Sequence, residues 1–155
     1  MVTDGRGDVG REATDADAGI WRGRSVARRF VSPDGFTVLV GRTAADNDVL
    51  TSKLADPGDW WLHVAGASGS HVVVRNPDQL DRLPRDTIRF AAALAAGYSR
   101  ARAAARAEVH VARCRDVSKP RGAPPGQVAL RRFATVRVVP TREPGGPGLA
   151  TAPDD

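Results

Sequence analysis

The 155-residue chain contains one cysteine, Cys114, so an internal disulfide is excluded. This is typical of a protein from a reducing compartment, because structural disulfides form where the surroundings are oxidising. Cys114 lies in an alternating Val, Ala and His segment. We therefore expect it to be a small buried hydrophobe and not a nucleophile.

Long apolar runs are also missing. No stretch approaches the ~18 apolar residues of a membrane-spanning helix. The first residues lack the basic-then-apolar order of a secretory signal. We therefore expect a cytoplasmic protein that makes no membrane contact, with one domain large enough to bury its own core.

Acidic residues are scarce in the body of the chain and concentrated at its ends. The whole chain carries +5, residues 1–19 carry −3 and residues 141–155 carry −2, so residues 20–140 carry +10. A basic body of this size is typical of a polyanion binder, although a positive surface can also serve solubility alone. The two acidic ends have few large apolar side chains, which predicts disordered tails around a single domain at residues 20–140.

Residues 59–74, DWWLHVAGASGSHVVV, are predicted to form two strands joined by a turn of small residues. Both arms have the two-residue period of a pleated strand, so Trp61 and His63 share one face. The turn residues Gly69 and Ser70 could leave backbone N–H groups free to cradle an anion. They are also simply good turn formers.

The rest of the body is predicted to alternate strands and helices. We expect strands at 25–31 and 36–40 around a Pro-Asp-Gly turn, a short helix within 42–55, a long Ala-rich helix from about 86 to 106, strands at 108–115 and 133–140, and a Pro/Gly loop at 117–127. Thr43 or Asp46 could cap the short helix. The predicted fold is α+β, a mostly antiparallel sheet of about six strands with one long Ala-rich helix and one short helix.

Several motifs then occur in a recognisable order: residues 41–48 (GRTAADND), 59–64 (DWWLHV), 69–73 (GSHVV), 91–99 (AAALAAGYS), 117–120 (VSKP) and 125–128 (PGQV). Over about residues 36–140 this set resembles the RNA-binding (NFACT-R) domain of the NFACT family, which includes ribosome quality control factors that engage tRNA on obstructed large ribosomal subunits. The resemblance implies RNA binding. We expect structured RNA such as tRNA or rRNA, in translation, ribosome quality control or RNA modification, with the ribosome or an RNA-modification enzyme as further candidate partners.

Two positions depart from the family's usual GRNxxQND pattern. Thr43 replaces an amide by a hydroxyl, and Asp46 replaces one by a carboxylate that would repel a phosphate. Among these 155 residues we expect no counterpart of the amino-terminal domain, helix-hairpin-helix and coiled-coil arms of the full-length factors. Addition of carboxy-terminal tails to stalled peptides is therefore not expected of this chain alone.

The candidate RNA-binding residues come from these motifs and the loop that follows them. They are Arg42, Asn47, Asp48, Trp61, His63, Gly69, Ser70, His71, Lys119 and Arg121. Arg42 stands where a strand meets a helix, a junction that can hold a phosphate, or it could pair with a nearby acid. Asn47 and Asp48 could contact RNA or brace a loop. Lys119 and Arg121 could clamp an RNA backbone or belong to a solvated loop.

The two hairpin histidines and Trp61 leave several interpretations open. Trp61 could stack on a base or lie in the core. His63 and His71 could face one another and offer two imidazoles to a phosphate or a 2′-hydroxyl. They lack a third metal ligand at a characteristic spacing and an accompanying nucleophile. We therefore predict a non-catalytic RNA binder with no metal or cofactor. The alternatives are an RNA-processing or RNA-modifying enzyme centred on this hairpin, or a protein-docking module of a ribosome-associated complex.

Overall fold

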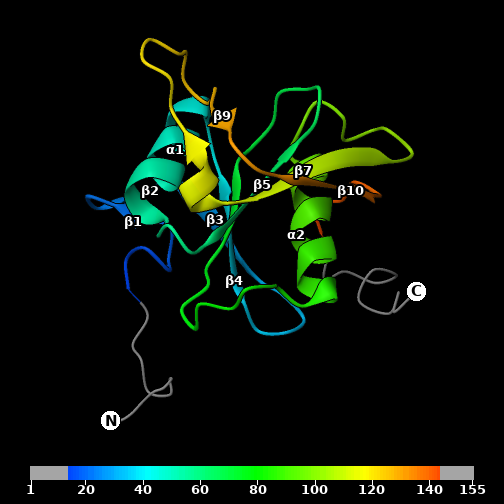
Figure 1. Ribbon diagram of the computed structural model, residues 1–155, viewed down its shortest axis with the longest axis horizontal. Coiled ribbons are helices and arrows are strands. Elements are labelled where there is room, and N and C mark those ends of the chain that lie inside the picture. Colours follow the sequence, from blue (N-terminus) through cyan, green and yellow to red (C-terminus); the bar gives the residue numbers. More distant parts are fainter. Residues whose placement is uncertain (1–13, 144–155) are drawn as a thin grey trace.

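A six-stranded antiparallel sheet organises the computed structural model, which describes residues 14–143 (Figure 1). The strand order is β10-β7-β5-β6-β4-β3, and the predicted α+β fold is confirmed. The sheet strands are β3 (Ala27–Val31), β4 (Thr37–Gly41), β5 (Trp60–Val64), β6 (Val72–Val74), β7 (Ala107–Arg113) and β10 (Ala134–Val138). The other elements are β1 (Ile20–Trp21), β2 (Arg24–Ser25), α1 (Ala44–Val49), the π-helical turn η1 (Leu50–Leu54), α2 (Arg85–Gly97), the 3-10 turn η2 (Cys114–Asp116), β8 (Val117–Ser118) and β9 (Ala129–Leu130).

Both predicted hairpins are confirmed. Strands β3 and β4 pair around the Pro-Asp-Gly turn, and β5 pairs with β6. Trp61 lies opposite Val73, and His63 lies opposite His110 of β7. Because neighbouring residues of a strand point to opposite faces, Trp60 and Trp61 belong to two different layers of the domain.

Helix α2 covers one face of the sheet. Its alanines pack against valines of β4, β6 and β7, including Val38, Val72 and Val109, all fully buried. Alanine side chains are short, so the helix backbone can approach the sheet closely. No helix in residues 14–143 combines the length and apolar character needed to cross a membrane.

Helix α1 and the turn η1 cover the opposite face (Figure 1). Leu50 and Leu54 of η1 pack there with Leu39, Trp61 and Val73, the inward residues of three strands. The side chain of Thr43 accepts a hydrogen bond from the Asp46 N–H, so Thr43 is the helix cap, as one of the two alternatives predicted. The predicted short helix is therefore present, although its second half is a π-helical turn.

Helix α2 is shorter than predicted. It ends at Gly97, whereas the Ala-rich sequence suggested an end near residue 106. The chain after Val138 crosses this end, because the Thr141 N–H donates to the Ala93 carbonyl and Arg142 Nε donates to the Gly97 carbonyl. Ser99 then bridges to Gly69 of the central hairpin. These long-range contacts outweigh the helix propensity of the alanines that follow.

The predicted loop at 117–127 is bounded by a strand pair that the sequence did not reveal. Strands β8 and β9 pair over two residues each, and the segment between them folds over the α1 face of the sheet. Figure 1 shows this segment projecting beside α1.

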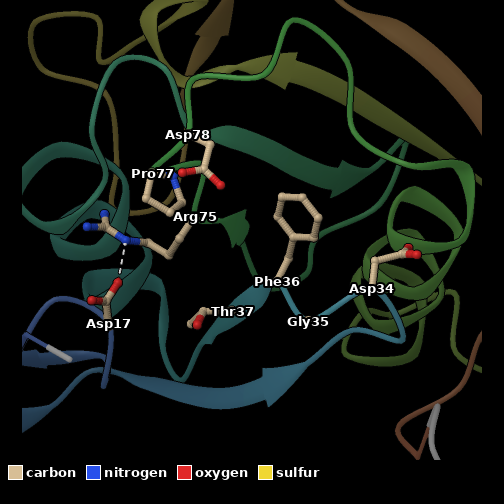
Figure 2. A pocket seen from close by; sticks show the side chains of 8 residues that line it. All are labelled: Asp17, Asp34, Gly35, Phe36, Thr37, Arg75, Pro77 and Asp78. Carbon is tan, nitrogen blue, oxygen red and sulfur yellow. Dashed lines mark hydrogen bonds and ion pairs between the residues drawn. The ribbon is translucent and has the colours of Figure 1, made fainter. Parts of the chain in front are cut away.

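Residues 14–19, assigned to a tail from the sequence, form a turn held by a buried ion pair. Arg75 is 9% exposed, and its Nε lies 3.1 Å from Oδ1 of Asp17 (Figure 2). Arg75 Nη1 lies 2.8 Å from Asp59 Oδ2. The remainder of the two predicted tails, residues 1–13 and 144–155, lies outside the described residues.

Candidate nucleic-acid interface

Asn47 joins two of the sequence motifs. Its Oδ1 accepts a hydrogen bond from the backbone N–H of His71 at 3.0 Å, and its Nδ2 donates to the Gly69 carbonyl at 3.4 Å. The side chain is 5% exposed and lies directly over Gly41, where a Cβ would collide with Oδ1. Glycine at 41 and asparagine at 47 therefore form one unit that braces the tip of the central hairpin.

Asp48 joins the same helix to the β8–β9 loop. Its Oδ1 accepts from the Gly126 N–H at 3.1 Å, and its Oδ2 lies 3.1 Å from the Nζ of Lys119. Lys119 also donates to the Pro124 carbonyl. Asp48 and Lys119 thus hold the loop against α1, which is the bracing interpretation of Asp48.

His71 is fixed at both ring nitrogens. Nε2 lies 2.8 Å from the Gly126 carbonyl, which only accepts, so Nε2 carries the proton and donates. Nδ1 is then an acceptor and lies 2.7 Å from the Thr51 hydroxyl. The residue is 1% exposed, and burial lowers the pKa of His71 to about 4. His71 is therefore neutral at physiological pH.

His63, His71 and Trp61 form one cluster on the α1 face. The ring centroids of the two histidines lie 5.6 Å apart, and the His63 ring stacks on Trp61 at 5.8 Å with 15° between the planes. Trp61 is 2% exposed and belongs to the core. His63 is half-buried, and burial lowers the pKa of His63 as well. The two imidazoles contact each other, and His63 is more exposed to solvent than His71.

The hairpin tip is hydrogen-bonded to its surroundings. The Ser70 N–H donates to the Tyr98 carbonyl at 3.0 Å, and Ser70 Oγ donates to the Gly41 carbonyl at 2.7 Å. A Cβ at Gly69 would approach Ser99 Cβ to 2.6 Å, so glycine is required for this contact. The Ser70 amide is thus already engaged and is not available to an anion.

Arg42 and Arg121 are the two candidate cations with exposed guanidinium groups. Arg42 Nε donates to the Ser25 hydroxyl at 3.0 Å, and the Arg42 N–H donates to the Val26 carbonyl. The nearby Asp46 carboxylate is buried and lies 2.7 Å from Arg24. That ion pair neutralises the acid whose charge the sequence suggested would repel a phosphate.

Two residues beside this cluster were not among the candidates selected from the sequence, His110 and Phe133. His110 lies opposite His63 on the neighbouring strand β7. Its ring centroid lies 4.4 Å from that of Phe133, which is 52% exposed. The alternation of residues 107–113 puts His110 on the same face as Ala112. The sequence does not show which strand pairs with β5, so it could not place His110 beside His63.

A hollow lies beside Arg75 (Figure 2). It has a volume of about 220 Å³ and is lined by Asp17, Asp34 and Asp78 as well as Arg75. The guanidinium group already faces Asp17 and Asp59. Three carboxylates around an arginine that is already ion-paired would repel a phosphate, so we assign no RNA contact to this hollow.

The braced hairpin, the antiparallel sheet with a helix on each face and the +10 charge of residues 20–140 define a basic α+β domain of the kind that binds polyanions. Comparison with known protein families shows which family the domain belongs to. The sequence model of the family described as NFACT protein RNA binding domain matches residues 27–132, and the chain belongs to that family.

Several relatives share this domain. The chain is 39% identical over 122 residues to the Rqc2 homolog RqcH of Streptococcus suis, covering 77% of this chain and 21% of that protein. The RqcH of Bacillus subtilis is 38% identical over 117 residues, covering 74% of this chain and 20% of that protein. The chain therefore spans about a fifth of the length of these curated relatives.

A solved structure has the same fold. The C-terminal part of the fibronectin/fibrinogen-binding protein from Streptococcus suis superposes with a TM-score of 0.71 at 35% sequence identity. The match covers 77% of this chain and 47% of that chain.

Proposed function

We propose that this domain binds structured RNA, with tRNA as the preferred partner, in the context of ribosome quality control. The family match over residues 27–132 is the observation that carries the proposal. A relative from Schizosaccharomyces pombe, ribosome quality control complex subunit 2, is 33% identical over 72 residues and supports the ribosomal context. The +10 charge of residues 20–140 supports a polyanionic ligand.

The geometry divides the candidate residues into those that can contact RNA and those that hold the site in shape. Arg42, Arg121 and His63 present side chains that a ligand can reach, and we propose that they contact RNA directly. The other candidates act by position: Asn47, Asp48, Trp61, Gly69, Ser70, His71 and Lys119 hold the hairpin and the β8–β9 loop in place.

The proposed function is non-catalytic. Acid–base catalysis by the two hairpin histidines would require both rings to exchange protons with substrate, and His71 has both ring nitrogens engaged by Gly126 and Thr51. Incubation with total tRNA should therefore leave the RNA intact on a denaturing gel and unchanged in mass.

Salt dependence tests the binding directly. For about four phosphate contacts, the affinity for tRNA should fall about 100-fold between 50 and 200 mM salt, because each neutralised phosphate releases counterions. A filter-binding titration of the intact chain against unfractionated tRNA measures this slope. Affinity that does not change with salt would contradict the proposal.

A further inference from the structure

A pocket opens on the α1 face of the sheet, between the ends of β5 and β7 and the loop that leads into β9. Its volume is about 230 Å³. The lining residues are Trp61, His63, Val64, Gly66, Ala67, His71, His110, Gly126, Gln127, Val128 and Leu130. The pocket thus adjoins His63, which we propose as an RNA contact.

The chemistry of the lining is uncharged. Among the described residues that line the pocket there is no Asp, Glu, Lys or Arg. A phosphate placed here would lose its water without gaining a counter-charge, which is costly. A neutral, largely apolar group with polar edges suits Val128 and Leu130 much better.

Among the described residues, the lining includes one buried donor without a partner and further residues with polar side chains. Trp61 is 2% exposed, and its indole Nε1–H is buried without a hydrogen-bond partner in residues 14–143. Buried donors are normally paired, so an acceptor that reached this N–H would satisfy an otherwise unpaired group. His63 adds a ring nitrogen, and Gln127 adds an exposed amide with both donors and acceptors.

Two aromatic contacts involve residues that line this pocket, although Phe133 itself lies outside the lining. His63 is stacked on Trp61, and His110 contacts Phe133, whose ring is 52% exposed. Exposed rings on nucleic-acid-binding domains serve as stacking platforms for bases. Arg121 lies in the loop that contributes Gly126 and Gln127 to the pocket, so a charge for the attached backbone is carried by the same segment.

We propose that this pocket receives a single unpaired nucleobase of the bound RNA, which makes the domain selective for bulged or looped bases within structured RNA. The proposal rests on the proposed function and deepens it. A volume of about 230 Å³ is below the roughly 300–1,000 Å³ of sites for drug-sized ligands, which suits one ring system without its sugar and phosphate.

Two RNA duplexes of the same sequence test the proposal, one fully paired and one with a single bulged nucleotide. The bulged duplex should bind about ten-fold more tightly, the effect of one stacked base. In ¹⁵N-labelled protein, the bulged duplex should shift the indole N–H resonance of Trp61. Trp60 is the internal control, because its Nε1–H is also buried and unpaired but lies on the α2 side.

The variant Phe133→Ala should remove most of the preference for the bulge and leave the affinity for the paired duplex within two-fold. His63→Ala should also remove the preference, but it should weaken binding to both duplexes because His63 is a proposed RNA contact. Val139→Ala is the matched control, an exposed apolar residue (59%) beyond the other end of β10. Equal affinity for the two duplexes, or an unshifted Trp61 resonance, would overturn the pocket while the proposed function stands. Failure of the wild-type protein to bind either duplex or tRNA would instead overturn the proposed function.

Discussion

The imidazole rings of His63 and His71 lie 5.6 Å apart and nearly perpendicular, at 87°. Both contact Trp61, yet they differ in chemistry. Both line the same pocket, but His71 is 1% exposed and hydrogen-bonded to Thr51 and Gly126, whereas His63 is only half-buried. One hairpin therefore supplies a structural histidine and an accessible one, and mutations at the two positions should have different consequences.

The stability of the domain should depend on pH through His71. Its folded-state pKa is about 4, against about 6.5 in an unfolded chain. Between these values the unfolded state binds more protons, so the free energy of unfolding falls as the pH falls from 6.5 towards 4. The loss should reach about 2–3 kcal/mol, measured by urea unfolding at pH 7 and pH 4.5.

Two controls identify His71 as the source. His71→Gln keeps an N–H donor for the Gly126 carbonyl and should show a smaller loss over the same pH range. In the wild-type protein, the C2 proton resonance of His71 should not titrate above pH 5. Titration of that resonance near pH 6.5 would show that the ring is not sealed as described.

Gly41 and Asn47 should be energetically coupled. Gly41→Ala places a Cβ against Asn47 Oδ1 and should destabilise the domain by roughly 1–3 kcal/mol. Asn47→Ala leaves the His71 N–H unpaired and should cost about the same. In the Asn47→Ala background the obstacle is gone, so adding Gly41→Ala should be nearly neutral. Additive losses in thermal or urea unfolding would contradict the coupling.

Cys114 should react only when the domain unfolds. The thiol is 8% exposed, and burial raises its pKa, so little thiolate is present at neutral pH. Labelling with a chromogenic disulfide reagent should be slow in buffer and complete within minutes in concentrated urea. Rapid labelling of the folded protein would contradict the buried placement, which the sequence predicted from the lone cysteine in a strand.

Local patterns in the sequence were sufficient for most of the sheet. The alternation in residues 60–64 put Trp61 and His63 on one face, and the structure confirms that arrangement. The burial of Cys114 and the capping role of Thr43 were also predicted from local context. These features depend on neighbours within a few residues, which a sequence displays directly.

Long-range contacts account for what the sequence did not reveal. The early end of α2 depends on Thr141 and Arg142, more than 40 residues away in the chain. The cover over His71 comes from Gly126, which lies 55 residues further along. No periodicity encodes such contacts, so the sequence left open whether Asn47 and Asp48 contact RNA or brace a loop. It also did not reveal that His110 lies beside His63 and Phe133 beside His110.

We expect RNA to bind on the α1 side of the sheet through exposed arginines. The most direct test compares tRNA affinity over a salt series for the double variant Arg42→Ala/Arg121→Ala and for Arg89→Ala, an exposed arginine of α2 on the other side. Each lost phosphate contact lowers the salt slope by about one, so the double variant should lose about two and bind at least ten-fold more weakly at low salt. Arg89→Ala should bind like the wild type. Wild-type binding by the double variant, or an equal loss in Arg89→Ala, would show that RNA does not bind through these arginines on the α1 side.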